Sequence, residues 1–343
     1  MLCAATEEKT LSSFSNVPIP LFEIGGIWVP RLILGNLPFL GESYQGLETN
    51  NVYLERFSHL EYTTRLLERA IGRHNLTAIS VMPPMNHLSN LFFQALTRAE
   101  SNTGIEAGLI ACFTIPLTID SKPLDDYRRW TTYYHIEAKS DSGIAKKYLE
   151  DPILQCRQGW TEKFSEAIAD PHPYDEHDIR RMSLDRGRLQ ENLDSLKGCK
   201  VLLVEPGSET DFLAMTGRLD LLKEVIEYAK DSLGCSAIVG IHHAGTTIPI
   251  LEEQRIGIEG YLTPVNKLGA LMLPSMHQAL EAVTSSKRPV VAIKTMAGGR
   301  IIPAKAFHFV LEKAHVDALS IGVADEHELD IDVDEARNAL SMG

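Results

Sequence analysis

The sequence predicts a closed α/β barrel of eight strand–helix units, the (β/α)8 class. Short apolar, β-branched runs alternate along the 343 residues with longer stretches whose apolar side chains have helical spacing. Several of the runs are apolar at almost every position, as expected for parallel strands that are buried on both faces. No G-x-G-x-x-G motif follows any run, so the sequence gives no support to an open sheet of the dinucleotide-binding type.

Nine runs have the composition of strands: residues 31–35, 76–82, 108–115, 133–139, 200–205, 237–242, 260–266, 290–295 and 316–321. A barrel needs one fewer, so we expect one run within 108–139 to be an additional strand or hairpin. Residues 22–30, with Gly25 and Gly26 at their centre, predict a hairpin on the barrel floor. Residues 141–199 are irregular and rich in turn residues, which predicts an insertion outside the regular units of a single barrel domain over 1–343.

Composition excludes several classes of partner. The net charge is −13, from 46 acidic and 33 basic residues, which argues against nucleic acid and anionic membranes. The apolar runs are too short to span a bilayer, and no export signal is visible at the N-terminus. Five scattered cysteines without a C-x-x-C pair predict reduced thiols in a cytoplasmic protein rather than disulfides or a zinc site. The sequence leaves a homo-oligomer open.

Five segments between about residues 185 and 335 follow one another in the order of a known barrel family. They are Leu189-Gln-Glu-Asn-Leu running into Val201-Leu-Leu-Val-Glu-Pro, Val239-Gly-Ile-His-His, Thr263-Pro-Val-Asn, Val291-Ala-Ile-Lys-Thr-Met-Ala-Gly-Gly-Arg and Ile321-Gly-Val-Ala-Asp-Glu-His-Glu-Leu. In order and spacing they resemble the fourth to eighth strands of the aldo-keto reductase superfamily. The resemblance implies an eight-stranded barrel with NADPH as the alternative cofactor.

The catalytic residues of that family are matched poorly. Its proton-donating set is Asp, Tyr, Lys and His at the ends of early strands, but the second strand here ends Ile79-Ser-Val-Met-Pro-Pro, with neither the Asp nor the Tyr. Glu205 stands where the family has its His, and Lys139 is the candidate for its lysine. Ala324 stands where the family has a basic, cofactor-binding residue. We therefore predict that this chain does not use NADPH as an ordinary aldo-keto reductase does.

Polar residues at the C-terminal ends of strands are the candidates for chemistry, because barrel enzymes place their active sites there. Glu205 follows four apolar residues, and a carboxyl group beside an apolar wall can serve as acid, base or metal ligand. His242 and His243 end the next strand, and imidazole is a proton shuttle or a metal ligand. We expect Glu205, His242 and His243 to bind a divalent metal ion. A further ligand is needed, and the sequence does not choose among Glu137, His135, Asp211 and Glu209.

Lys294 and the loop after it are candidates for substrate binding. Lys294 follows an apolar strand, where it can bind an anion, polarise a carbonyl group or form a Schiff base. In the next loop, Gly298, Gly299 and Arg300 have the composition of a phosphate-binding loop, which predicts a small anionic or phosphorylated substrate. Asn266, at the end of the sixth strand, is a further candidate for binding this substrate.

Three functions remain open from the sequence. The first is a metal-assisted or acid–base enzyme, a hydrolase, isomerase or lyase, in which Glu205, Lys294 and His242 are catalytic. The second is an atypical NADPH-dependent carbonyl reductase, with Glu205 in place of the usual His and Lys139 or Lys294 supplying charge. The third is a barrel that binds a partner without catalysis. A barrel fold by itself does not separate them.

Overall fold

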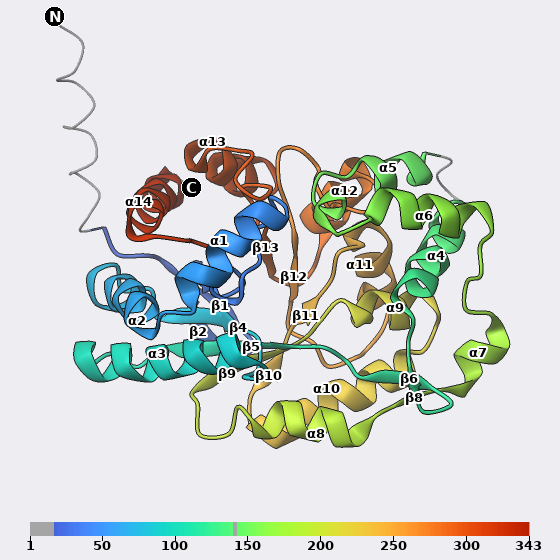
Figure 1. The fold of residues 1–343 in the computed structure, drawn as a ribbon, viewed down its shortest axis with the longest axis horizontal. Coiled ribbons are helices and arrows are strands. Elements are labelled where there is room, and N and C mark those ends of the chain that lie inside the picture. The colour runs from blue at the N-terminus through green and yellow to red at the C-terminus, as the bar shows by residue number, and fades with distance from the viewer. Residues whose placement is uncertain (1–16, 140–142, 343) are drawn as a thin grey trace, which may run out of the picture.

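The computed structural model describes residues 17–139 and 143–342, and these form a parallel α/β barrel (Figure 1). Its strands are β3 (Leu32–Gly35), β4 (Ala78–Val81), β5 (Gly108–Phe113), β9 (Val201–Pro206), β10 (Ser236–Ala237), β11 (Val239–Gly240), β12 (Tyr261–Pro264), β13 (Val290–Ile293) and β14 (Ala318–Ile321). All neighbouring strands pair in parallel, and the order runs from β10 through β9 and β3 to β11.

The barrel has eight strand positions around its circumference, which we call staves, because β10 and β11 are two halves of one strand. Only Ile238 separates them, and its N–H donates to the carbonyl oxygen of Val204 over 2.9 Å. β10 pairs with β9 on one side, and β11 pairs with β12 on the other, which closes the sheet on itself. The expected (β/α)8 barrel is confirmed.

The interior of the barrel is filled by one buried apolar side chain from each stave. This ring consists of Ile33, Ala78, Ile110, Leu203, Ile238, Leu262, Val291 and Ala318. Phe22, Ile24 and Val29 belong to the same buried cluster, and they come from the antiparallel hairpin of β1 (Leu21–Ile24) and β2 (Ile27–Pro30). Since β2 leads directly into β3, the hairpin closes the N-terminal end of the barrel, as predicted, and leaves the opposite end open to carry a site.

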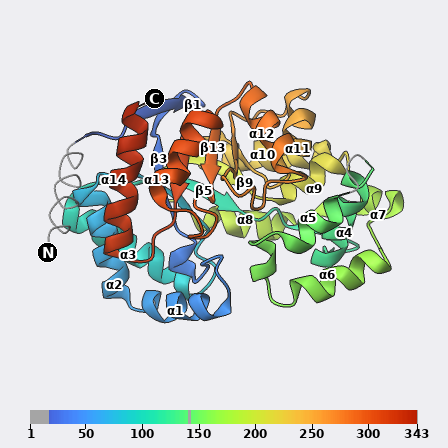
Figure 2. The same ribbon diagram turned by 90° about the horizontal axis from the view of Figure 1, so that it is seen from above.

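The helices of the regular units surround the sheet (Figure 2). They are α1 (Leu47–Phe57), α2 (Leu60–Glu68), α3 (His87–Thr103), α8 (Arg186–Asp194), α9 (Glu209–Met215), α10 (Leu219–Leu233), α11 (Ala244–Glu252), α12 (Met276–Ser285), α13 (Pro303–His308) and α14 (Glu326–Met342). In α10 the buried residues Leu221, Leu222, Val225, Ile226 and Ala229 recur at helical spacing, so a single apolar stripe faces the sheet. No helix among the described residues has both the length and the apolar character needed to cross a bilayer.

An insertion follows the third stave, between β5 and α8. It contains β6 (Leu117–Ile119), β7 (Lys122–Pro123), α4 (Asp126–Glu137), α5 (Ile144–Glu150), α6 (Trp160–Ala169), α7 (Glu176–Arg181) and β8 (Met182–Leu184). In Figures 1 and 2 the helices α4 to α7 gather on one side of the barrel, away from α2 and α3. The insertion was expected at 141–199, but it begins at β6, and α8 within that range is a regular barrel helix. Residues 141 and 142 lie outside the described part of the chain.

The run at 133–139, expected as a strand, is instead the end of helix α4. The β-branched and aromatic residues of this run favour a strand by composition. Two local features favour the helix. The side chain of Asp125 caps its first turn by accepting from the N–H of Arg128 over 2.8 Å, and the buried Trp130, Tyr133 and Glu137 recur at spacings of three and four. The amphipathic pattern and the cap therefore outweigh strand propensity here.

Candidate active site at the barrel mouth

A cavity of about 550 Å³ opens at the C-terminal end of the barrel. Every stave contributes a lining residue, and in all staves except β12 this residue is the last or next to last of the strand: Gly35, Val81, Phe113, Glu205, Gly240, Leu262, Ile293 and Ile321. The ends of parallel strands converge on the open side of a barrel, which is where enzymes of this architecture bind their substrates. Three of the residues predicted to be catalytic, Glu205, His242 and Lys294, all line this cavity.

Glu205 lies at the wall of the cavity with only 3% of its surface exposed. It pairs in register with Cys112 of β5, and its side chain lies across the Cα of Gly240, where a Cβ would overlap Oε1. Burial raises the pKa of Glu205 from 4.5 to about 8, against the opposing effects of the Cys112 thiol and the Lys294 charge. Oε2 has no hydrogen-bond partner among the described residues. The carboxyl group is therefore protonated at neutral pH and can donate to a bound molecule.

Lys294 follows β13 directly and has the left-handed backbone conformation, with φ of 54°. Its Nζ lies 3.4 Å from Nε2 of His242 and 4.9 Å from the centre of the Tyr44 ring. Burial lowers the pKa of Lys294 from 10.5 to about 8, although Glu205 opposes the shift. A residue other than glycine in this conformation is uncommon, and such conformations gather at functional sites.

The two neighbouring histidines face different surroundings. His242 lines the cavity, and burial together with the Lys294 charge lowers its pKa well below 6.5, so its imidazole is neutral. His243 is 1% exposed and does not line the cavity. Its Nδ1 lies 2.9 Å from Oε1 of Glu137 and 3.5 Å from the Tyr148 hydroxyl, both in the insertion. His243 therefore fixes the insertion to the barrel through Nδ1, and the structure does not place it with Glu205 on the cavity lining, as the predicted metal site requires.

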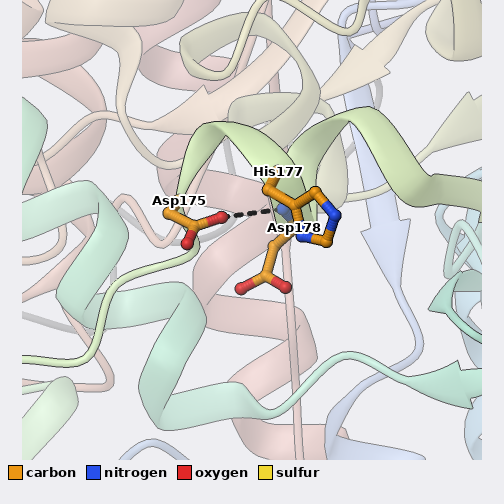
Figure 3. A group of neighbouring side chains, drawn as sticks. All are labelled: Asp175, His177 and Asp178. Carbon is orange, nitrogen blue, oxygen red and sulfur yellow. Dashed lines mark hydrogen bonds between the residues drawn. The ribbon is translucent and has the colours of Figure 1, made fainter.

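The third ligand expected for this metal does not complete a site either. Among the described residues, the group of three His, Cys, Asp or Glu side chains whose ligand atoms lie within 4.8 Å of one another is Asp175, His177 and Asp178 on α7 (Figure 3). Asp175 caps that helix by accepting from the N–H of Asp178, and the Asp178 carboxylate is paired with Arg128 at 2.7 Å. These side chains are partly or fully exposed, and exposed acidic clusters of this kind are common without a bound metal. The structure gives the expected divalent ion no support.

The loop predicted to bind phosphate is held in place by hydrogen bonds to neighbouring main-chain atoms. Gly298 and Gly299 line the cavity with positive φ. Arg300 is not among the lining residues, because its Nη1 donates to the carbonyl oxygens of Tyr44 and Ala297, each over 2.8 Å. These bonds hold the loop in place and direct Nη1 toward main-chain carbonyl oxygens, so the structure gives the predicted anion contact of Arg300 no support.

Asn266 also has a structural function. It is fully buried, and its side chain both donates to the carbonyl oxygen and accepts from the N–H of Ala270. These two bonds close the turn that follows β12. Asn266 is not among the residues that line the cavity, so its expected contact with substrate is wrong.

Proteins of known structure include some with a similar architecture. No protein-family model matches the sequence, and the curated proteins include no match. Two solved structures of a protein assigned as an aldo-keto reductase from Pseudomonas aeruginosa are similar to this chain. One has 12% identity and a TM-score of 0.55, covering 96% of this chain and 100% of that chain. The other has 12% identity and a TM-score of 0.54, covering 96% and 99%.

The chain has a barrel fold similar to that of these two structures. The resemblance seen in the sequence is confirmed at the level of the fold, since this degree of identity establishes nothing finer. The two lysines considered as a source of positive charge lie in different parts of the structure. Lys139 is exposed at the end of α4 and is absent from the cavity lining, so it does not supply the missing lysine. Lys294, at the mouth, is the lysine that the cavity contains.

Asp332 is a lining residue that sequence reasoning missed. The acidic composition of residues 325–335 is typical of a solvated helix face, but Asp332 is 5% exposed and lines the cavity. Burial, together with Glu328 and Asp325, raises its pKa to about 8. The signal was present in the sequence, because Asp332 lies on the same helical face as the buried Leu329 and Ala336.

Proposed function

We propose that the barrel mouth binds a small carbonyl compound and makes its carbonyl carbon electrophilic. The observation that carries this proposal is the position of the Glu205 carboxyl group, which is buried at the wall of the cavity with an unpaired oxygen and whose pKa burial raises to about 8. A neutral carboxylic acid in such a position donates a hydrogen bond, and then a proton, to a developing oxyanion. The Lys294 ammonium supplies positive charge on the same side of the cavity.

The charge of the cavity lining favours an uncharged substrate over the phosphorylated one that we expected. Among the described residues of the lining, Lys294 is the only Lys or Arg. Carboxylates of Glu42, Glu209 and Glu328 also line it. A phosphate dianion would be repelled by these three carboxylates and would have a single cation, Lys294, to offset the repulsion, whereas a small aldehyde or ketone carries no charge to be repelled.

The likeness of the barrel to aldo-keto reductases makes carbonyl reduction the first reaction class to test, with a nicotinamide cofactor as hydride donor. The residues of this chain fit NADPH poorly. In the loop after β14, where the family has a basic residue, the N–H of Ala324 donates to Glu328 over 2.9 Å. Arg56 and Tyr62 both donate hydrogen bonds to the carbonyl oxygen of Ala324, and Asp325 is the next residue in the chain. A 2′-phosphate at this position would lie next to the carboxylates of Asp325 and Glu328, and the loop therefore does not fit NADPH.

The proposal is tested by ligand binding with a matched pair of variants. We expect small ketones and aldehydes, such as hydroxyacetone and glycolaldehyde, to raise the melting temperature of the protein and to show saturation-transfer NMR signals. Glu205→Ala should weaken this binding, because it removes the hydrogen-bond donor, while the exposed Glu227→Ala should not. Binding that is equal in both variants, or no binding of any carbonyl compound, would refute the proposal.

The same samples test the reductase reaction. Titration calorimetry with NADH and NADPH, followed by assays of aldehyde reduction, measures cofactor use directly. We expect NADPH to bind no more tightly than NADH, because the cation of this loop, the Arg56 guanidinium, already donates to the Ala324 carbonyl oxygen and lies 3.6 Å from the Asp325 carboxylate. Tight binding of NADPH with turnover of a simple aldehyde would contradict our prediction about the cofactor and establish an ordinary reductase.

A further inference from the structure

The geometry of the cavity points to Lys294 as a nucleophile whose amine adds to the carbonyl carbon of the bound compound and forms a protonated imine. This inference rests on the proposed function, because it needs a carbonyl compound in the barrel mouth. It goes further by assigning a covalent intermediate and a residue that carries it. Substrates would be aldehydes and ketones whose carbonyl carbon reaches Nζ.

The position of Lys294 is costly to maintain and has no evident structural purpose. A left-handed conformation at a residue with a side chain costs on the order of 1–2 kcal/mol. Burial of the ammonium group adds a further cost, which a structural lysine usually offsets by pairing with a carboxylate. Among the described residues, Nζ has a hydrogen-bonding contact with the neutral Nε2 of His242 at 3.4 Å and lies 4.9 Å from the centre of the Tyr44 ring, and it forms no ion pair with a carboxylate. Strained, poorly compensated groups of this kind occur where a fold positions a reacting atom.

The proton state of Lys294 suits addition to a carbonyl group. With a pKa of about 8, close to one in ten Lys294 side chains is neutral at pH 7, whereas an ordinary lysine with a pKa of about 10.4 is neutral in fewer than about one in a thousand. The neutral imidazole of His242 lies next to Nζ and can accept its proton. Desolvation of a lysine in an apolar cavity is an established route to a nucleophilic amine.

The step balances within the residues of the cavity. The Nζ lone pair forms a bond to the carbonyl carbon, and the carbonyl π electrons move to oxygen. One amine proton passes through His242 to this oxygen, and Glu205 gives it a second proton. Water then leaves as the nitrogen lone pair forms the C=N double bond. Neutral amine, carbonyl compound and protonated Glu205 thus become protonated imine, water and Glu205 carboxylate, and no oxidant or reductant is needed.

In the product state, the negative charge of the Glu205 carboxylate balances the positive charge of the iminium ion. The iminium ion carries one positive charge in the position where the Lys294 ammonium had it, and Glu205 becomes the negative partner. The interaction between Glu205 and Lys294 favours the charged form of each residue. The covalent step therefore replaces a neutral acid and a neutral amine by an ion pair in a cavity of low polarity, where such pairs attract strongly.

A 1,3-diketone tests the inference without a reductant. 2,4-Pentanedione converts a reactive lysine into a conjugated enaminone, which is followed by its new ultraviolet absorbance and by the added mass of the intact chain. We expect one adduct for each chain, mapped by peptide mass spectrometry to Lys294. The adduct should form in the Lys305→Met control, in which an exposed lysine of α13 is removed. It should not form in Lys294→Met.

The pH dependence separates a buried nucleophile from surface lysines. With a pKa of about 8, the rate of enaminone formation should rise about tenfold from pH 7 to pH 9 and then level off. An ordinary lysine would give an increase of about a hundredfold over the same interval and no plateau. His242→Asn should slow the reaction without removing the adduct, since the imidazole only transfers the proton.

The outcomes of this test and of the test of carbonyl binding are distinguishable. Hydroxyacetone binding by NMR, with no adduct at Lys294 even at pH 9, would overturn the inference and leave the proposed function standing. An adduct that maps to another lysine would also overturn it. Absence of both binding and adduct would refute the two proposals together. Lys294→Arg keeps the charge and serves as a folded control, checked by its melting curve, if Lys294→Met does not fold.

Discussion

Replacement of Glu205 by glutamine should stabilise the protein, and the gain should grow with pH. The unfolded chain releases the Glu205 proton near its ordinary pKa of 4.5, whereas the folded protein holds it up to about 8. Folding at pH 7 therefore carries the cost of keeping a proton that the unfolded chain has lost, about 3 kcal/mol, against about 1 kcal/mol at pH 5. Glutamine never ionises, so Glu205→Gln removes this cost.

The difference between the two pH values is the quantity to measure. Burial of an amide in place of a carboxylic acid changes stability by an amount that does not depend on pH, and it cancels in the comparison. Urea unfolding curves, followed by tryptophan fluorescence, should show that Glu205→Gln gains about 2 kcal/mol relative to the wild type between pH 5 and pH 7. Glu227→Gln, at an exposed position, should show no comparable gain. An equal effect of Glu205→Gln at both pH values would show that the Glu205 carboxyl group is hydrated and ionised.

Three further substitutions test other contacts. Gly240→Ala places a Cβ against Oε1 of Glu205 and should cost about 1–3 kcal/mol in urea unfolding, and most of this cost should disappear in the double variant with Glu205→Ala. Glu137→Gln leaves the buried His243 without its carboxylate and should cost about 3 kcal/mol, seen as a clear fall in melting temperature; a change below 1 kcal/mol would mean that this pair does not hold the insertion. Arg300→Ala removes three donors to main-chain carbonyls and should lower stability by about 1 kcal/mol, with no effect on inorganic phosphate binding in calorimetry; loss of phosphate binding would restore the anion-binding interpretation.

The eight staves of the barrel could be predicted from the sequence because burial on both faces requires an apolar residue at almost every position of a strand. Each stave of a closed parallel sheet must be apolar toward the interior and toward the helices, so runs such as 201–204 and 290–293 have almost no polar residue. The run at 133–139 lacked that constraint. Its helix is determined by the Asp125 cap and by packing of Trp130 and Tyr133 against His243, which lies more than a hundred residues later in the chain.

The candidate site could be predicted only where a strand end determines the position of a side chain. Glu205 and Lys294 follow apolar strands directly, so the architecture alone places them at the mouth. The direction of His243 and the contacts of Arg300 depend on the insertion and on the loop after β3, whose positions relative to the barrel are set by tertiary packing. Sequence spacing does not determine such contacts, which is why the barrel could be predicted and confirmed, whereas the structure gives the predicted metal and phosphate sites no support.

The insertion leaves and re-enters the barrel through a single narrow junction. β6 and β8 pair antiparallel, with Leu117 opposite Leu184 and Ile119 opposite Met182, so the chain returns to the point where it departed. Replacement of residues 120–181 by a short turn would therefore join two ends that are already adjacent, with little change in loop-closure entropy. Such a shortened chain would keep all eight staves. It would also lose Glu137 and Arg129, the partners of His243 and Glu209, so a minimal barrel would need apolar residues at these two buried positions.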